Sequence, residues 1–339
     1  MKFILYIRFF FYFFIRMIQY KNRKQRAIIM ENTKNRKRRG IFKLGDLPLH
    51  LMALPALLYV IIEGYIPMVG SLIAFQRYDV SKGIFGSMFV GFDNFKFLFS
   101  TTDAFVITRN TILYNLAFIG VGAVFSIFVA LMLNMLRQRG TAKVMQTVYM
   151  LPYFLSFAVI SIVVYAFLDK GSGFINVLLR AFGAQSGNWY MNKKIWPPLL
   201  VFLNTWQASG YQTVLFLAAI AGISSDYYEA AMLDGASRLQ QARYITLPHL
   251  RVVASISIIL SFGNIFRGNM GLFYLVTHNT GTLYPVTSVI DTYIYNGLKQ
   301  LHNLSMTSAA GLYQSVFGLV VILIANRVVG KIDPDSALF

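Results

Sequence analysis

Long apolar stretches alternate with shorter polar ones over most of this chain. A helix needs about 20 mostly apolar residues to cross the hydrocarbon layer of a membrane. Six stretches meet that length, at residues 47–75, 108–136, 144–168, 196–222, 251–276 and 307–329. The pattern therefore predicts an all-α membrane protein with six transmembrane helices.

The first 46 residues depart from this pattern. Their opening stretch is aromatic and apolar, but Arg8 and Arg16 divide it into pieces too short to span a membrane. This stretch is consistent with an amphipathic helix at the membrane surface. An equally good interpretation is that the natural chain starts at Met30, after this stretch. We assign residues 1–46 to a basic N-terminal extension, residues 47–329 to the membrane domain and residues 330–339 to a cytoplasmic tail.

Composition narrows the class of protein further. Of the 339 residues, 56% are hydrophobic and only 13% are charged, whereas about a quarter of a soluble domain is charged. The net charge of +18 raises the question of a nucleic-acid partner. Nucleic-acid binders carry their basic residues on a soluble face, but here these residues flank apolar stretches. We therefore expect a membrane partner and no nucleic acid.

The placement of lysine and arginine predicts the orientation of the spans. Ten of these residues lie between Lys21 and Lys43, directly before the first span. Cytoplasmic loops carry an excess of basic residues, so this end is expected in the cytoplasm. Six spans return the C-terminus to the same side. The expected location is the cell membrane, which the chain crosses several times.

A polar segment, Ser224 to Leu250, separates the fourth and fifth apolar stretches. We call residues 224–250 the coupling segment. Asp226 followed by Glu229 is typical of a helix start, and Ser225 is an equally good N-cap. The first helix is expected to run through residues 227–234.

The second half of the coupling segment predicts a turn and another helix. Gly235 can turn the chain sharply, because glycine adopts positive φ without steric cost. Ser237 followed by Gln240 forms a second capping pattern, which predicts a short helix over residues 238–246. Pro248 is expected to end that helix and to occupy the first turn of the fifth span.

An amphipathic segment alone would suit an ordinary solvated loop helix, but the spacing of the coupling segment is more specific. The segment reads Glu-Ala-Ala, then three residues, Gly, nine residues, Ile, one residue and Leu-Pro. This pattern closely resembles the signature loop of permease subunits in binding-protein-dependent ABC importers. The stretches YIPMVGSLIAFQRYD, FVGFDNFKFLF and VIDTYIY are similar to the carbohydrate branch, the maltose-type and lipoprotein-linked polysaccharide permeases. The resemblance covers about residues 47–339.

The resemblance implies a type I ABC importer permease fold with both termini in the cytoplasm. In that family the loop, residues 223–249 here, is a coupling helix that docks on a separate ATPase subunit. The residues that match the motif and its turn are Glu229, Ala230, Ala231, Asp234, Gly235, Ile245, Leu247 and Pro248. The family's motif glutamate faces the ATPase, which assigns that contact to Glu229.

The resemblance also implies partners. They are a second permease subunit in a heterodimer, two ATPase subunits and an extracellular sugar-binding (lipo)protein. The chain has no G-x-x-x-x-G-K-[ST] loop, so ATP and Mg are expected on the partner ATPase. We expect the chain itself to have no cofactor, no metal site and no catalytic residue. Without cysteine it has no thiolate metal ligand or disulfide.

Polar groups inside spans are costly and often mark the path of a substrate. The candidates here are Tyr153, Asn204, Gln207, Tyr211, Asn264 and Arg267. Asn204, Gln207 and Tyr211 are spaced to share one helix face. Asparagine and glutamine also join helices to one another in membranes, and the sequence leaves that alternative open.

Arg267 has two interpretations of its own. It lies sixteen residues beyond Arg251, which is roughly 24 Å along an unbroken helix. There it could reach the membrane surface with its long side chain. If it faces the cavity, a uronate-containing oligosaccharide becomes an attractive substrate, because arginine pairs with carboxylates through two hydrogen bonds.

Two other functional classes compete with the importer interpretation. An intramembrane enzyme needs paired carboxylates, a histidine cluster or a nucleophile with its base, and the sequence has no H-E-x-x-H or G-x-S-x-G motif. An ion-coupled secondary transporter needs carboxylates within its spans and no ATPase docking loop. We keep the secondary transporter as the alternative.

Overall fold

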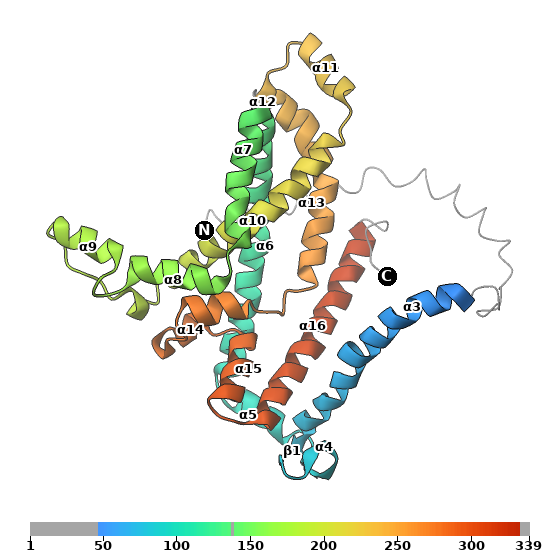
Figure 1. Ribbon diagram of the computed structural model, residues 1–339, viewed down its shortest axis with the longest axis vertical. Coiled ribbons are helices and arrows are strands. Elements are labelled where there is room, and N and C mark those ends of the chain that lie inside the picture. The colour runs from blue at the N-terminus through green and yellow to red at the C-terminus, as the bar shows by residue number, and fades with distance from the viewer. Residues whose placement is uncertain (1–46, 137–138, 333–339) are drawn as a thin grey trace. The chain divides into compact units, whose positions relative to one another are not determined.

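The computed structural model describes residues 47–136 and 139–332 (Figure 1). Four helices are long and apolar enough to cross a membrane, and two bent helix pairs raise that number to six. The predicted all-α membrane architecture is therefore confirmed. Residues 47–72 and 323–332 belong to one compact unit, and residues 73–322 form the other. The extension assigned to residues 1–46 lies outside the described residues, as does the tail assigned to residues 330–339 from residue 333 onward.

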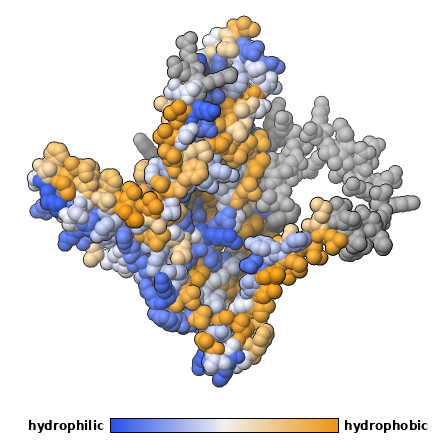
Figure 2. Space-filling model, viewed as in Figure 1, coloured by the Kyte–Doolittle hydropathy of each residue, from blue (hydrophilic) through white to orange (hydrophobic). Residues whose placement is uncertain are grey.

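The first span is one continuous apolar helix over His50–Phe75. It consists of α3 (Leu47–Val60), a π-helical turn (Ile61–Tyr65) and a 3₁₀ stretch (Ile66–Phe75). Its hydrophobic side chains are mostly exposed, and hydrophobic residues dominate the surface of α3 (Figure 2). An apolar helix needs contact with lipid or with another protein to bury such a surface.

A compact loop follows the first span. Strands β1 (Gln76–Arg77) and β2 (Met88–Phe89) pair antiparallel around the short helix α4 (Gly83–Gly86). Helix α5 (Asp93–Ser100) packs beside them, since Asn94 donates hydrogen bonds to the carbonyls of Ala74 and Gln76 at 2.9 Å. These contacts join the loop to the end of the first span.

Two long helices form the centre of the larger unit. They are α6 (Asp103–Met135) and α10 (Trp196–Ala221). Small polar residues bring them close, because the Ser126 hydroxyl donates to Gln212 at 3.2 Å and the Thr213 hydroxyl donates to the Ser126 carbonyl at 3.4 Å. Small residues allow such close helix packing in membranes.

The third predicted span is bent rather than straight. Helix α7 (Arg139–Met150) continues into a 3₁₀ turn (Leu151–Phe154), and α8 (Phe157–Leu168) leaves at 95° to the preceding helix. Pro152 and the N-cap of Ser156 explain the bend. The Ser156 hydroxyl accepts the N–H of Val159 and starts a new helix. Helix α9 (Phe174–Ala181) and a 3₁₀ turn (Trp189–Met191) then lead to α10.

The coupling segment contains the expected helix, turn and helix, with two corrections. Helix α11 covers Ser225–Leu233, and its N-cap is Ser224 rather than Asp226 or Ser225. The second helix, α12 (Arg238–Gln241), does not end at Pro248. It passes through a π-helical turn (Ala242–Thr246) into α13 (Leu247–Phe262), so that Arg238–Phe262 is one helix. Pro248 has no N–H to donate, and the wider π-helical turn does not need that hydrogen bond.

The fifth predicted span, residues 251–276, is wrong in its extent. Helix α13 ends at Phe262, and the chain forms an irregular loop over residues 263–269. We call this loop the break loop. A π-helical stretch (Gly271–Val276) follows, with Thr277 as its C-cap. The mean apolarity of 251–276 is high enough for a span, but hydropathy does not register the glycines at 263, 268 and 271.

The remaining elements complete the larger unit. A 3₁₀ turn (Gly281–Leu283), α14 (Tyr284–Thr287) and α15 (Ile290–Lys299) lead to α16 (Leu304–Ile332). One hydrophobic cluster, which includes Ile107, Phe266, Ile290 and Tyr313, joins α6, the break loop, α15 and α16. The break loop is thus packed among helices that are distant in the sequence.

Candidate functional site

A polar cleft of about 280 Å³ lies between α6, α10 and the break loop. Asn115 and Gly122 contribute from the middle third of α6, and Asn204 and Gln212 contribute from the middle of α10. Polar residues halfway along transmembrane helices are the usual place for a transported substrate to bind. We therefore take the polar cleft as the candidate substrate site.

The polar cleft brings together half of the predicted path residues. Asn204, Asn264 and Arg267 all line it. Arg267 is exposed, and among the residues that the structure describes none hydrogen-bonds to its guanidinium. The expected position of Arg267 24 Å along an unbroken helix is wrong, because the helix ends at Phe262. Its side chain lines a cavity instead, as the second interpretation requires.

The other three path residues lie elsewhere. Tyr153 and Tyr211 stack with ring centroids 5.3 Å apart and an angle of 17° between the rings. The Gln207 amide donates to the carbonyl of Leu155 at 3.4 Å. All three residues join α10 to the bend between α7 and α8. Gln207 therefore acts as a link between helices, while Tyr211 is exposed and available to other contacts.

Side chains from three helices hold the break loop. The Asn115 amide of α6 donates to the carbonyls of Ile265 and Arg267, both at 3.0 Å. The Gln314 amide of α16 donates to the carbonyl of Phe266 at 2.8 Å. Irregular backbone at membrane depth requires such partners, because lipid offers none.

Asp291 of α15 completes this set. Its Oδ2 accepts the N–H of Gly268, and it also accepts the Gln314 amide at 3.0 Å. Gly268 has no room for a side chain, since a Cβ atom there would lie 2.7 Å from Asp291.

Sequence reasoning missed Asn115, Gln212, Asp291 and Gln314. One signal was available for Asp291, which is the only acidic residue between Asp234 and Asp333. For Asn115 and Gln314 the signal was a lone amide in an apolar stretch, the same criterion that selected Asn204. No sequence pattern indicates that these amides meet at the break loop.

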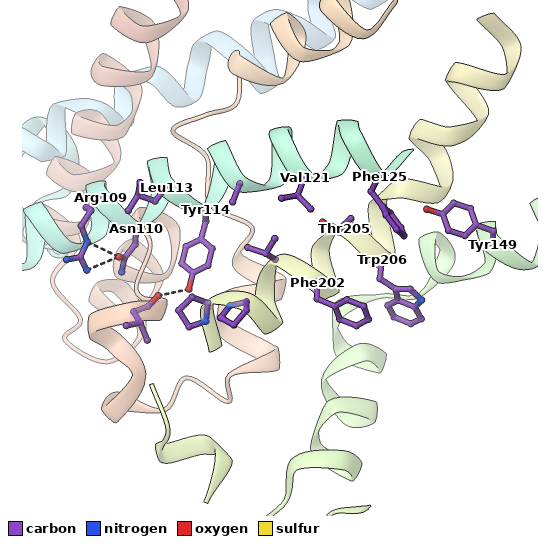
Figure 3. A pocket seen from close by; sticks show the side chains of 15 residues that line it. Arg109, Asn110, Leu113, Tyr114, Val121, Phe125, Tyr149, Phe202, Thr205 and Trp206 are labelled. Atoms are coloured by element: carbon purple, nitrogen blue, oxygen red, sulfur yellow. Dashed lines mark hydrogen bonds between the residues drawn. The ribbon is translucent and has the colours of Figure 1, made fainter. Parts of the chain in front are cut away.

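A second cavity, the apolar groove, runs along a different face of α6. Its volume is about 820 Å³, and it is lined by side chains such as Leu113, Val121, Phe125, Phe202 and Trp206. Figure 3 shows Arg109 and Asn110 at one end and Tyr149 near the other. Apart from that first end the lining is almost entirely hydrophobic, so the groove suits lipid or protein better than sugar.

The coupling segment presents its motif at the surface. Glu229, Ala230, Asp234, Gly235, Leu247 and Pro248 are exposed, and Ala231 and Ile245 are half-buried. Gly235 has φ of +76°, so the predicted turn is present. Hydrophobic neighbours are exposed as well, including Met232, Leu233, Leu239 and Tyr244. A surface of this kind is suited to another protein.

The coupling segment is tied to the membrane helices. The Arg238 guanidinium donates to the carbonyl of Met135 at the end of α6, at 2.6 Å. The hydroxyls of Tyr228 and Thr246 are 3.0 Å apart, which links α11 to the π-helical turn. Figure 1 shows α11 and α12 at one end of α13. Movement of the segment would therefore act on both α6 and α13.

Within residues 47–136 and 139–332 no group of histidine and acidic side chains is placed to hold a metal ion. The side chains that line the polar cleft can offer hydrogen bonds and an ion pair to a substrate. The arrangement fits a translocation path.

Comparison with known proteins identifies the family. Residues 122–334 match the family described as the inner membrane component of binding-protein-dependent transport systems. The polygalacturonan/rhamnogalacturonan transport system permease protein YteP of Bacillus subtilis (strain 168) is 34% identical over 91% of this chain and 96% of its own length. Protein LplB of the same organism is 33% identical over 85% of this chain and 90% of its own.

A solved structure agrees with these relatives. A chain of a bacterial alginate ABC transporter, crystallised with an alginate pentasaccharide-bound periplasmic protein, superposes with a TM-score of 0.75. It is 30% identical and covers 85% of this chain and 95% of its own. The type I importer permease fold is thereby confirmed, and the ion-coupled secondary transporter is set aside. The chain belongs to the family of inner membrane components of binding-protein-dependent transport systems, and it is a multi-pass membrane permease.

Proposed function

We propose that this permease imports oligosaccharides that contain uronates. An extracellular binding protein delivers them, a second permease completes the path, and two separate ATPase subunits drive the cycle. The observation that carries the substrate class is Arg267, an exposed cation beside Asn204 and Asn264 in a cleft halfway along the spans. The Arg267 guanidinium lines the cleft with its donors free of hydrogen bonds to the described residues, and a uronate carboxylate can accept from them.

The similar proteins support the same substrate class. One relative is named for polygalacturonan and rhamnogalacturonan transport, and one similar structure belongs to an importer of the acidic polysaccharide alginate. Galacturonan and alginate both carry carboxylates on their sugar units. The asparagines of the polar cleft would bind hydroxyl groups, and Arg267 would distinguish acidic from neutral sugars.

Energy is proposed to enter at the coupling segment. Glu229 and its exposed hydrophobic neighbours would dock on an ATPase subunit, which would bind ATP and Mg. The chain itself would then be a non-catalytic subunit. The coupling segment is joined to α6 by the hydrogen bond from Arg238 and is continuous with α13. These two connections give a physical route from the ATPase to the polar cleft.

Substitution of Arg267 tests the substrate class. Arg267→Gln keeps much of the length and hydrogen bonding of the side chain but removes its charge. A hydrogen bond to a charged group is worth about 1.5–3 kcal/mol, so we expect the half-saturation concentration for a uronate oligosaccharide to rise about tenfold or more. Uptake is measured with the complete transporter and its binding protein in proteoliposomes.

A neutral oligosaccharide of equal length provides the control. Its half-saturation concentration should change by less than about threefold, because the hydrogen bonds of the cleft remain. The matched variant Asn264→Ala removes a neighbouring polar side chain and should weaken both sugars alike. Equal effects of Arg267→Gln on the two sugars would make Arg267 a structural residue.

A further inference from the structure

The break loop contains the cation of the polar cleft, yet it has no regular secondary structure of its own. Residues 263–269 lie between α13 and Met270, which directly precedes the π-helical stretch that begins at Gly271. Only short-range turns link them internally, such as the bond from the Arg267 N–H to the Asn264 carbonyl at 2.9 Å. Turns of this kind do not by themselves fix the direction of a long side chain.

Three side chains supply the hydrogen-bond partners that the backbone of the loop lacks. Asn115 binds the carbonyls on both sides of Phe266, and Gln314 binds the carbonyl of Phe266 itself. The N–H of Gly268, directly after Arg267, goes to Asp291. The polar backbone groups on either side of Arg267 are therefore fixed by three different helices.

Asp291 is the central member of this set. One oxygen atom, Oδ2, accepts both the Gly268 N–H and the Gln314 amide. The carboxylate thus joins α15, α16 and the break loop at one point. Gly268 allows this approach, since any Cβ atom at that position would overlap Asp291 and Val289. Glycine at this position therefore permits the close approach of the backbone to Asp291.

From these contacts we infer that Asp291 is a positioning residue, which fixes the break loop and thereby directs Arg267 into the polar cleft. The inference rests on the proposed function for its link to uronate selectivity. Asp291 does not touch the substrate. It acts through the backbone of Gly268 and through Gln314, and it keeps the guanidinium from turning toward other surfaces. Loss of Asp291 would leave the Gly268 N–H without an acceptor, would remove one of the two acceptors of the Gln314 amide and would free the loop.

The test measures the loop directly. The chain has no cysteine, so a single cysteine at Asn264 can carry a nitroxide spin label. The Asn264 side chain is exposed and lines the cleft beside Arg267. Spectra are recorded for the complete transporter in nanodiscs, with the cysteines of the partner subunits replaced, for Asp291, Asp291→Asn and Asp291→Ala. We expect an immobile label with Asp291, little change with asparagine, which still accepts hydrogen bonds, and a mobile label with alanine.

A matched control uses another carboxylate. Asp169 accepts the N–H groups of Gly171 and Ser172 at 3.0 and 2.8 Å, in a loop after α8. Asp169→Ala removes a comparable set of bonds and should leave the label at position 264 immobile. If Asp291→Ala prevents assembly, Gln314→Met serves instead, because it removes the bonds to Phe266 and Asp291 and preserves the size of the side chain.

Transport provides the second measurement, in the same variants without the label. Asp291→Ala should raise the half-saturation concentration for a uronate oligosaccharide about tenfold and change the maximal rate by less than about threefold. Asp291→Asn should restore most of the loss. An immobile label in Asp291→Ala would overturn the inference, as would equal mobility in Asp169→Ala. If Asp291→Ala does not assemble, an immobile label in Gln314→Met overturns it instead.

The two proposals fail in different ways. If Arg267 does not select uronates, Arg267→Gln imports acidic and neutral sugars with unchanged preference, whatever the label reports. If Asp291 is not a positioning residue, Arg267→Gln still alters the preference, but Asp291→Ala leaves the label immobile. A mobile label together with unchanged uronate uptake would also refute the positioning role.

Discussion

The coupling segment and the break loop both interrupt apolar helices, but they satisfy their backbone polar groups in different ways. The coupling segment uses nearby residues. Ser224 caps α11, Ser237 and Gln240 form a capping box, and the N–H of Ala236 reaches back to Ala231 at 2.8 Å. The break loop depends on Asn115, which lies 150 residues away from Ile265 in the sequence.

This difference follows from the surroundings of the two regions. The coupling segment is largely exposed, and water can complete any hydrogen bond that the chain leaves open. The break loop lies among membrane helices, where a free carbonyl has no solvent partner. A segment that folds from local contacts can move as a unit. A segment held by distant helices moves only when those helices move.

The largest expected effect on stability comes from Asn115→Leu. This change leaves the carbonyls of Ile265 and Arg267 without the Asn115 amide, at about 1–3 kcal/mol for each. We expect a clear fall in the thermal unfolding midpoint of the purified transporter. In the part of the chain that the structure describes, no hydrogen bond is made by the Asn204 amide, so Asn204→Leu is the matched control. Equal shifts for the two variants would mean that the break loop does not depend on Asn115.

Gly235→Val should have a smaller effect. At φ of +76° a β-branched residue is strained, at a cost of about 1–3 kcal/mol. A Cβ atom at this position would meet no other atom within 4 Å, so the strain comes from the backbone alone. Gly235→Asn is the control, since asparagine tolerates this conformation. Unfolding and co-purification of the ATPase subunit are measured together. A valine variant as stable as the asparagine variant would contradict the strain argument.

Glu229→Lys should change stability least and transport most. The side chain is exposed, so the expected change in unfolding free energy is below about 0.5 kcal/mol. Reversal of its charge should nevertheless abolish uptake and the stimulation of ATP hydrolysis by the loaded binding protein. Asp226→Lys, on the same helix but outside the motif, should retain both activities. Normal uptake by Glu229→Lys would remove Glu229 from the coupling role.

The same contrast explains which features could be predicted from the sequence. The turn at Gly235 and the capping box at Ser237 follow from residues within a few positions of one another. The wrong N-cap of α11 was also a local error, because the true cap, Ser224, directly precedes the expected caps Ser225 and Asp226. Pro248 was expected to end a helix, but the π-helical turn before it accommodates the missing N–H donor.

The break loop could not be predicted in this way. Its sequence satisfies a hydropathy criterion, and its partners Asn115, Asp291 and Gln314 belong to other helices. Side chains such as Arg267 and Asn264 were selected because polar residues are rare in spans. Their meeting with Asn204 is a result of tertiary packing, which residue spacing within a helix does not describe.

The continuous helix over Arg238–Phe262 has a mechanical consequence. Its 25 residues form a rod about 37 Å long, with the coupling segment at one end and the break loop at the other. A tilt of about 5° about one end displaces the other by roughly 3 Å, which is comparable to the length of a hydrogen bond. The rod works as a lever arm, so a small rotation at the coupling segment can displace the break loop, and Arg267 with it, by the length of a hydrogen bond.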